Sequence, residues 1–206
     1  MFIAIVGPDG CGKTTVANAL VYRFKEKNIV AYHHAMHFQV LPKLKDFINP
    51  FLRNKLVSGH EEGEYHAGMK AKPNSILRGS VYVCWYAIDY FLGRFKLSKS
   101  LKRGEVIVFA RYYLDYYFQR GHINTPHLFI KFCELLVPTP TLIITIDRKA
   151  EDIYSLKPEL SINEIKRQQG IIENLFTKRS NAFIVDGTGG IDNTVDEIMH
   201  LIDTYK

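Results

Sequence analysis

The nine residues Gly7-Pro8-Asp9-Gly10-Cys11-Gly12-Lys13-Thr14-Thr15 fit the pattern G-x-x-x-x-G-K-[ST]. Glycines in such a run let backbone N–H groups point into one concavity, and the helix expected behind them adds a positive field. Lys13 has the length to reach the β- and γ-phosphates of a nucleotide, and the Thr14 hydroxyl can ligate Mg²⁺. The spacing therefore predicts a site for ATP and Mg²⁺. The residues expected to bind the nucleotide are Gly7, Asp9, Gly10, Cys11, Gly12, Lys13, Thr14 and Thr15.

A second cation stands at the end of a different apolar run. Residues 105–110 read as a strand of the buried, parallel type, and Arg111 follows directly. The carboxyl ends of parallel strands border the crevice where ligands bind. A guanidinium there suits bidentate contact with a phosphate. Arg111 is therefore a candidate catalytic residue.

Basic residues also follow a break between two predicted helices. The helix expected over 148–154 stops at Lys157, and the capping-box spacing of 161–164 starts a second helix that runs to about residue 179. A basic, broken helix hairpin suits a lid over a triphosphate. The break carries Lys157 and is followed by Lys166 and Arg167, and the lid is expected over about 148–168.

The elements that must position these groups alternate along the chain. Apolar runs predict strands over 2–6, 29–32, 105–110, 141–147 and 182–186. Helical patterns lie between them, and Asp192 or Thr194 is the expected cap of the last helix. Five strands alternating with helices predict an α/β fold of three layers, a five-stranded parallel sheet with helices on both faces.

The longest predicted helix, residues 74–102, begins at Asn74 or Ser75 and is apolar or aromatic over 81–92 except for Asp89. A helix that is apolar all round is buried, so this one is expected to cross the centre of the domain. A carboxylate there needs a partner, and structural pairing and ligand binding both remain open for Asp89. Arg78 and Arg94 flank the run and are candidates for contact with an acceptor phosphate.

Three less specific features complete the chain. His33, His34 and His37 follow the second strand. The adjacent pair would point to opposite faces, which disfavours a metal site, and any of the three can line the acceptor pocket. Residues 58–68 are polar and glycine-rich and predict a loop. Residues 187–190 predict a turn that can contact a purine base.

Composition limits the classes of partner. The chain has 206 residues, 47% of them hydrophobic, so residues 1–206 are expected to form a single domain. The net charge of +6 suits two phosphorylated ligands, and the scattered basic residues do not favour nucleic acid. No apolar run reaches the roughly 18 residues that span a bilayer, and no signal peptide is evident. Three cysteines without metal-ligand spacing predict free thiols and a cytoplasmic protein.

The order of these parts resembles the thymidylate kinase branch of the nucleoside monophosphate kinases over nearly the whole chain. The resemblance is carried by the final strand, turn and helix and by the segments GPDGCGKTT, VIVFARYYLDYY, TLIITID and SLKPELSINEIKRQ. It implies a P-loop NTPase fold and transfer of a phosphoryl group from ATP to a nucleoside monophosphate, with dTMP as the leading acceptor and dTDP as the product. Related kinases pair through their long apolar helix, so residues 81–92 are also a candidate homodimer seam.

The resemblance also assigns roles to single residues. Asp9 matches the acid that contacts the hydroxyl of the acceptor sugar. Gly10 stands where one subclass has a catalytic arginine, so the catalytic cation is expected from the lid, as Lys157, Arg167 or Arg148.

The main departure from the family pattern is Ala110, where relatives have an aspartate that helps to hold hydrated Mg²⁺ and the acceptor. Three outcomes stay open. Another acid, Asp9, Asp89 or Asp115, takes the role; the protein is slow; or alanine was introduced deliberately. The family's acceptor-binding arginine has no clear match either, because Tyr90 falls near its place. The alternatives to a dTMP kinase are therefore a kinase of another small acceptor and a nucleotide-binding protein with weak activity.

Overall fold

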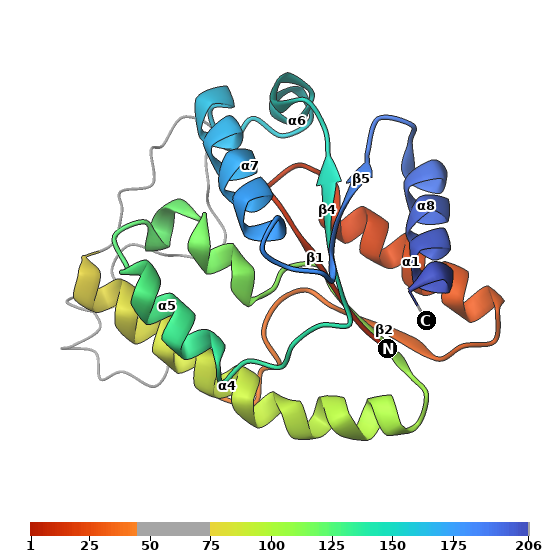
Figure 1. The fold of residues 1–206 in the computed structure, drawn as a ribbon, viewed down its shortest axis with the longest axis horizontal. Coiled ribbons are helices and arrows are strands. Elements are labelled where there is room, and N and C mark those ends of the chain that lie inside the picture. Colours follow the sequence, from red (N-terminus) through yellow and green to blue (C-terminus); the bar gives the residue numbers. More distant parts are fainter. Residues whose placement is uncertain (45–74, 206) are drawn as a thin grey trace.

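The computed structural model describes residues 1–44 and 75–205. In this part of the chain five strands form one parallel sheet in the order β2-β3-β1-β4-β5 (Figure 1). β1 (Phe2–Val6) is central, with β3 (Val106–Phe109) and then β2 (Ala31–His34) on one side. β4 (Leu142–Asp147) and β5 (Ala182–Asp186) lie on the other side. The predicted α/β class and five-stranded parallel sheet are confirmed.

Helices cover both faces of the sheet. α1 (Lys13–Glu26) and α8 (Ile191–Thr204) pack on one face, and α4 (Ile76–Lys102) and α5 (His127–Glu134) lie together on the other (Figure 1). α6 (Ala150–Leu156) and α7 (Ile162–Phe176) pack against each other after β4. Two short 3-10 helices follow β3, η1 (Tyr113–Tyr117) and η2 (Arg120–His122).

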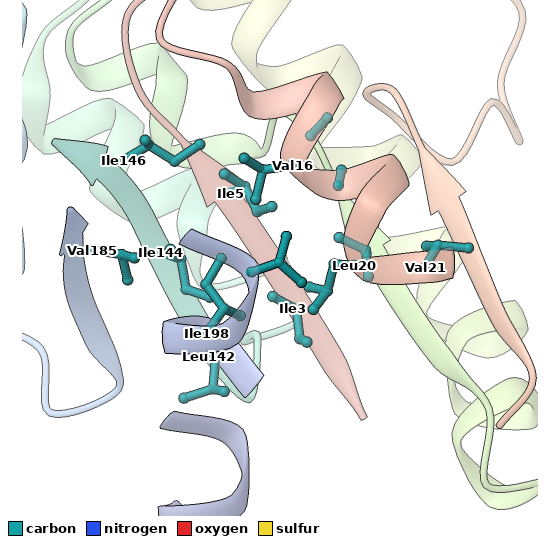
Figure 2. Close-up of a cluster of buried hydrophobic side chains, with 14 of the residues drawn as sticks. Ile3, Ile5, Val16, Leu20, Val21, Leu142, Ile144, Ile146, Val185 and Ile198 are labelled. Carbon is teal, nitrogen blue, oxygen red and sulfur yellow. The ribbon is translucent and has the colours of Figure 1, made fainter. Parts of the chain in front are cut away.

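The side chains of β1 alternate between two cores, as a strand buried on both faces requires. Ile3 and Ile5 join the cluster under α1 and α8, where Leu20 and Ile198 meet them (Figure 2). Phe2, Ala4 and Val6 join the second cluster, under α4 and α5. This double burial fixes the carboxyl end of β1, and so the start of the glycine-rich loop that follows it.

The expected position of the second strand is wrong by two residues. The strand begins at Ala31 because the end of α1 uses the preceding residues to satisfy its carbonyls. Asn28 takes a left-handed conformation (φ 58°), and the Ile29 N–H donates to the Phe24 carbonyl at 3.0 Å. His33 and His34 therefore lie inside β2 instead of beyond it.

Of the three helix caps predicted, two are confirmed and one is wrong. Ser75 and Ser161 cap α4 and α7, each accepting the N–H three residues ahead. The expected cap of α8 by Asp192 or Thr194 is wrong, because the helix begins at Ile191, directly after Gly190 with φ 89°. The Thr194 hydroxyl instead donates to the Gly190 and Asp186 carbonyls, from inside the helix.

The expectation that residues 81–92 are buried on all sides is wrong. α4 lies on one side of the sheet and buries a single face, on which Val83, Tyr86, Ala87 and Tyr90 are found. Ile88 is 39% exposed on the other face. Apolar composition alone does not require burial, because much of any protein surface is apolar.

None of the helices within residues 1–44 and 75–205 is both long and apolar enough to cross a membrane. The predicted loop over 58–68 lies outside the described residues.

Candidate functional site

The glycine-rich loop, residues 7–15, joins β1 to α1. Gly10 and Gly12 have φ angles of 95° and 103°, which residues with a side chain rarely adopt. Gly12 immediately precedes α1, whose first amide N–H groups have no partner within the helix. A Cβ on Gly10 would lie 3.0 Å from the Cβ of Lys157. The loop thus presents a helix N-terminus, and the end of α6 lies against it.

Lys13 is buried within the loop that it follows. Its Nζ donates to the carbonyl oxygens of Gly7 at 2.9 Å and Pro8 at 2.8 Å, and lies 3.4 Å from Asp9 Oδ1. Thr14 and Thr15 are exposed in the first turn of α1. Carbonyl and carboxylate oxygens therefore hold the ammonium group at the N-terminus of α1. The oxygens of a phosphate could take their place.

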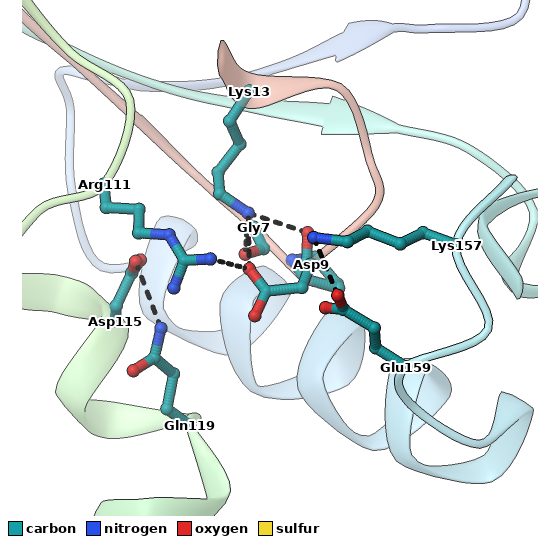
Figure 3. Close-up of polar contacts among 9 residues, drawn as sticks. Gly7, Asp9, Lys13, Arg111, Asp115, Gln119, Lys157 and Glu159 are labelled. Atoms are coloured by element: carbon teal, nitrogen blue, oxygen red, sulfur yellow. Dashed lines mark hydrogen bonds and ion pairs between the residues drawn. The ribbon is translucent and has the colours of Figure 1, made fainter. Parts of the chain in front are cut away.

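Asp9 joins the loop to the end of β3. Its Oδ1 accepts from Arg111 Nη2 at 2.5 Å while it faces Lys13 (Figure 3). Burial acts to raise the pKa of Asp9, but the charges of Lys13, Arg111 and Lys157 outweigh it and the pKa is lowered. Asp9 is thus an ionised carboxylate between cations of three different elements.

The position before Arg111 carries no acid. Ala110 is buried, and its N–H donates to the His34 carbonyl at 2.9 Å, which continues the pairing of β2 and β3. The chain then turns through Tyr112 into η1, which directs Asp115 back toward the loop (Figure 3). Asp115 is 1% exposed. Its Oδ2 accepts from Gln119 Nε2 at 3.5 Å, and its Oδ1 has no hydrogen-bond partner among the described residues.

The charged groups that act on Asp115 are the residues of the candidate site, Lys13, Arg111 and Asp9. Burial raises the pKa of Asp115 to about 7, Lys13 and Arg111 oppose that rise, and the charge of Asp9 adds to it. All three of these residues are therefore close enough to act on Asp115 electrostatically. Sequence reasoning named Asp115 as one acid of three, but only the fold of η1 distinguishes it.

Asp89 has a different environment. Its Oδ1 accepts from the backbone N–H groups of Val40 at 2.7 Å and Leu41 at 2.8 Å. Two amide donors on one carboxylate oxygen fix the segment that follows β2 against α4. Of the two readings left open for Asp89, structural pairing is what these contacts support.

The lid candidates lie in three places. Lys157 ends α6 and pairs with Glu159 at 3.0 Å, near Asp9 (Figure 3). Arg167 instead bonds to Glu164 and to the Phe118 carbonyl, with Nη2 distances of 2.6 Å to each. Arg148 keeps a buried Nε without a hydrogen-bond partner in the described part of the chain. The structure therefore brings Lys157 to the loop and ties Arg167 to the end of η1.

The two arginines of α4 differ in their surroundings. Arg94 is exposed and lies over the Phe91 ring of its own helix, at 5.4 Å from the ring centroid. Arg78 is half-buried near the start of α4.

Two of the three histidines, His34 and His37, join a cluster of aromatic rings from β3, α4 and η1. His34 stacks on Phe109 with ring centroids 5.0 Å apart, and His37 stacks on Tyr86 at 3.7 Å. Burial, with a contribution from His122, lowers the pKa of His37 to about 3, so its ring is neutral. Among residues 1–44 and 75–205 no three metal-ligating side chains of the His, Cys, Asp or Glu type come together. Sequence reasoning did not identify Tyr86, which the structure stacks on His37.

A separate hollow of about 830 Å³ lies between α5 and α7, lined among others by Leu128, Glu134, Leu175 and Arg179. None of its lining residues belongs to the glycine-rich loop, and neither Arg111 nor Asp115 reaches it.

The loop fits a magnesium nucleotide in its donor set. Mg²⁺ commonly takes one or two protein oxygens and completes its shell with phosphates and water, so the exposed Thr14 hydroxyl suffices.

Comparison with protein-family models finds no match, and neither does comparison with curated proteins.

Proposed function

We propose that the chain transfers the γ-phosphoryl group of ATP, bound with Mg²⁺, to a nucleoside monophosphate, with dTMP as the leading acceptor and dTDP as the product. The proposal places the glycine-rich loop in a P-loop NTPase fold. The observation that carries it is the array Lys13–Asp9–Arg111, in which one carboxylate oxygen links the helix N-terminus to the cation at the end of β3.

The donor side of the site is formed by the loop. Lys13 exchanges its carbonyl ligands on Gly7 and Pro8 for oxygens of the β- and γ-phosphates, while the loop amides and the Thr14 hydroxyl hold the triphosphate and its metal. A magnesium ion held by the Thr14 hydroxyl would supply positive charge to offset the negative charge of the phosphates. The protein's task is otherwise positioning.

The acceptor side is formed by Arg111 and Asp9. Arg111 faces both the donor and the acceptor phosphates, and Asp9 accepts from the acceptor hydroxyl. Lys157 supplies the lid cation, because it is the lid candidate whose charge already acts on Asp9. Arg167 needs to break its pair with Glu164 before it can take that role.

The direct test is the conversion of dTMP to dTDP with Mg²⁺ and ATP, followed by chromatography of the nucleotides, with the Lys13→Met protein as the control. The proposal expects dTDP and an equal amount of ADP from the wild type and neither from the variant. Absence of any dTMP-dependent ADP above that control would reject this acceptor.

Ala110 favours a second candidate, a nucleotide-binding protein with weak kinase activity. Its methyl group is buried where a carboxylate would serve the metal and the acceptor. Comparing ADP formation with and without dTMP in the wild type and in Ala110→Asp decides between the two. A large increase in dTMP-dependent ADP formation in Ala110→Asp supports the second candidate, a nucleotide-binding protein with weak kinase activity. A screen of other acceptors, nucleotides and sugar-linked metabolites among them, tests whether a different substrate gives the higher rate.

A further inference from the structure

Three acids are candidates for the part that Ala110 leaves vacant, and their contacts separate them. Asp89 accepts from the amides of Val40 and Leu41 through its Oδ1, and its Oδ2 is also buried without a partner among the described residues. An unpartnered oxygen therefore does not by itself distinguish Asp115 from Asp89. Asp9 is held between Lys13 and Arg111 through its Oδ1. Asp115 alone among these three combines deep burial, a position beside both catalytic cations, and only one long side-chain contact.

The unpartnered oxygen of Asp115 is informative because buried polar atoms are nearly always hydrogen-bonded. The ionised form of Asp115, which the charges of Lys13 and Arg111 favour, only accepts, so the partner of that form is a donor. The phosphate oxygens of a nucleotide accept as well and cannot pair with the ionised carboxylate. The remaining donors at a phosphoryl-transfer site are O–H groups, either of water on the magnesium ion or of the acceptor.

The neighbours of Asp115 point to the same place. η1 carries it toward the loop side of β3, where Lys13 and Arg111 lie (Figure 3). Tyr90, on which the charge of Asp115 acts, and Tyr116, the next residue along the chain, also keep buried hydroxyl oxygens without a partner in the described part of the chain. A polar ligand would supply a partner for such atoms.

We infer that Asp115 replaces the missing carboxylate at position 110, and that its Oδ1 accepts a hydrogen bond from an O–H donor at the transferring phosphoryl group. This inference rests on the proposed function and deepens it, because it assigns the acid that the family pattern places elsewhere. The acid is supplied five residues later along the chain, by a 3-10 turn instead of the end of a strand.

The test measures binding, so that it does not depend on turnover. A non-hydrolysable ATP analogue is titrated into the wild type, Asp115→Asn and Asp89→Asn by calorimetry, with Mg²⁺ and with EDTA. Asp89→Asn is the matched control, because it also neutralises a carboxylate that is 1% exposed but lies on other partners. Both variants are checked by thermal melting. The dTMP affinity of each analogue complex is then measured, with thymidine as a second probe.

Two results support the inference and identify the donor. If the tightening of analogue binding by Mg²⁺ falls at least about tenfold in Asp115→Asn alone, the donor is water on the metal. If that tightening is unchanged and the affinity for dTMP or thymidine falls by a similar factor in Asp115→Asn alone, the donor is the hydroxyl of the acceptor.

Other results overturn it, and they separate its failure from that of the proposed function. Asp115→Asn with wild-type affinities for Mg²⁺–analogue, dTMP and thymidine removes Asp115 from the site and leaves the proposed function standing. Equal losses in Asp89→Asn assign the effect to neutralising any buried acid. A wild type that binds no analogue with Mg²⁺ rejects both the inference and the proposed function.

Discussion

Arg111→Ala is expected to abolish most turnover while ATP binding persists. In the proposed function Lys13 and the loop amides hold the donor, and the Lys13 ammonium is positioned by the Gly7 and Pro8 carbonyls, not by Arg111. An arginine that neutralises charge in a phosphoryl-transfer transition state contributes a factor of ~10³–10⁵ to the rate. That factor corresponds to about 4–7 kcal/mol of transition-state stabilisation. The kcat is therefore expected to fall by at least about a thousandfold.

The structural cost of the same substitution is small. The Arg111 side chain is 32% exposed, and its pair with Asp9 joins one nitrogen to one oxygen. The Asp9 side chain is 18% exposed, so the pair is partly buried and contributes on the order of 1 kcal/mol to folding. Asp9 keeps Lys13 as a partner when Arg111 is removed. Loss of activity without loss of the folded state is thus the distinguishing result.

The assay is steady-state ADP release with dTMP, together with calorimetry of ATP-analogue binding. Arg103→Ala is the matched control, because Arg103 also pairs with an acid, Glu105 at 2.6 Å, but near the other end of β3. Arg111→Lys keeps the positive charge but loses the planar guanidinium, so its kcat is expected to lie between those of Arg111→Ala and the wild type. An Arg111→Ala enzyme as fast as the wild type, or an equal loss in Arg103→Ala, would refute the role given to Arg111.

Three further substitutions test separate contacts. Lys13→Met is expected to weaken binding of the ATP analogue by at least about tenfold, a loss of about 1.4 kcal/mol in calorimetry; unchanged affinity would contradict the site. Asp89→Asn is expected to lower the free energy of unfolding in urea by about 1 kcal/mol, because the Val40 and Leu41 amides lose a charged acceptor, with kcat unchanged. A fall in kcat without a fall in stability would place Asp89 in the site instead. Asp115→Asn is expected to gain stability over the wild type as pH rises. Folding raises the pKa of Asp115 in the wild type from 3.8 to about 7. Asp115 therefore contributes to stability at a pH below its unfolded-state pKa, and this contribution is lost as the pH rises through its folded-state pKa. Each unit of that pKa shift corresponds to about 1.4 kcal/mol of stability. The prediction is contradicted if urea unfolding gives the same difference in free energy of unfolding between variant and wild type at pH 4.5 and at pH 8.

The sheet could be predicted because its signal is local. Each strand of a doubly covered sheet is a short apolar run, and the runs over 141–147 and 182–186 have no competing helical period. The capping box at 161–164 likewise sets a helix start through contacts three residues apart.

Other features depend on contacts that local patterns do not contain. The start of β2 was displaced by the end of α1, where Asn28 accepts a left-handed conformation. The face that α4 exposes depends on which neighbours reach it. The surroundings of Asp115 depend on the 3-10 geometry of η1, which no pattern in the sequence indicated.

The site was predictable as a set of residue types and less so as an arrangement. Lys13, Asp9 and Arg111 could each be named from position, but the shared Asp9 oxygen joins groups 102 residues apart in sequence. The lid cation could only be narrowed to a few residues, because Lys157 and Arg167 differ in their contacts with Glu159, Glu164 and Phe118.

The most direct test is calorimetric titration of the wild-type protein with an ATP analogue, in the presence and absence of Mg²⁺. Saturable binding to one site, tightened by Mg²⁺ and lost in Lys13→Met, is the expected result. Failure of the wild type to take up any adenine nucleotide with Mg²⁺, in a sample that melts cooperatively, would contradict the assignment of the glycine-rich loop and everything that depends on it.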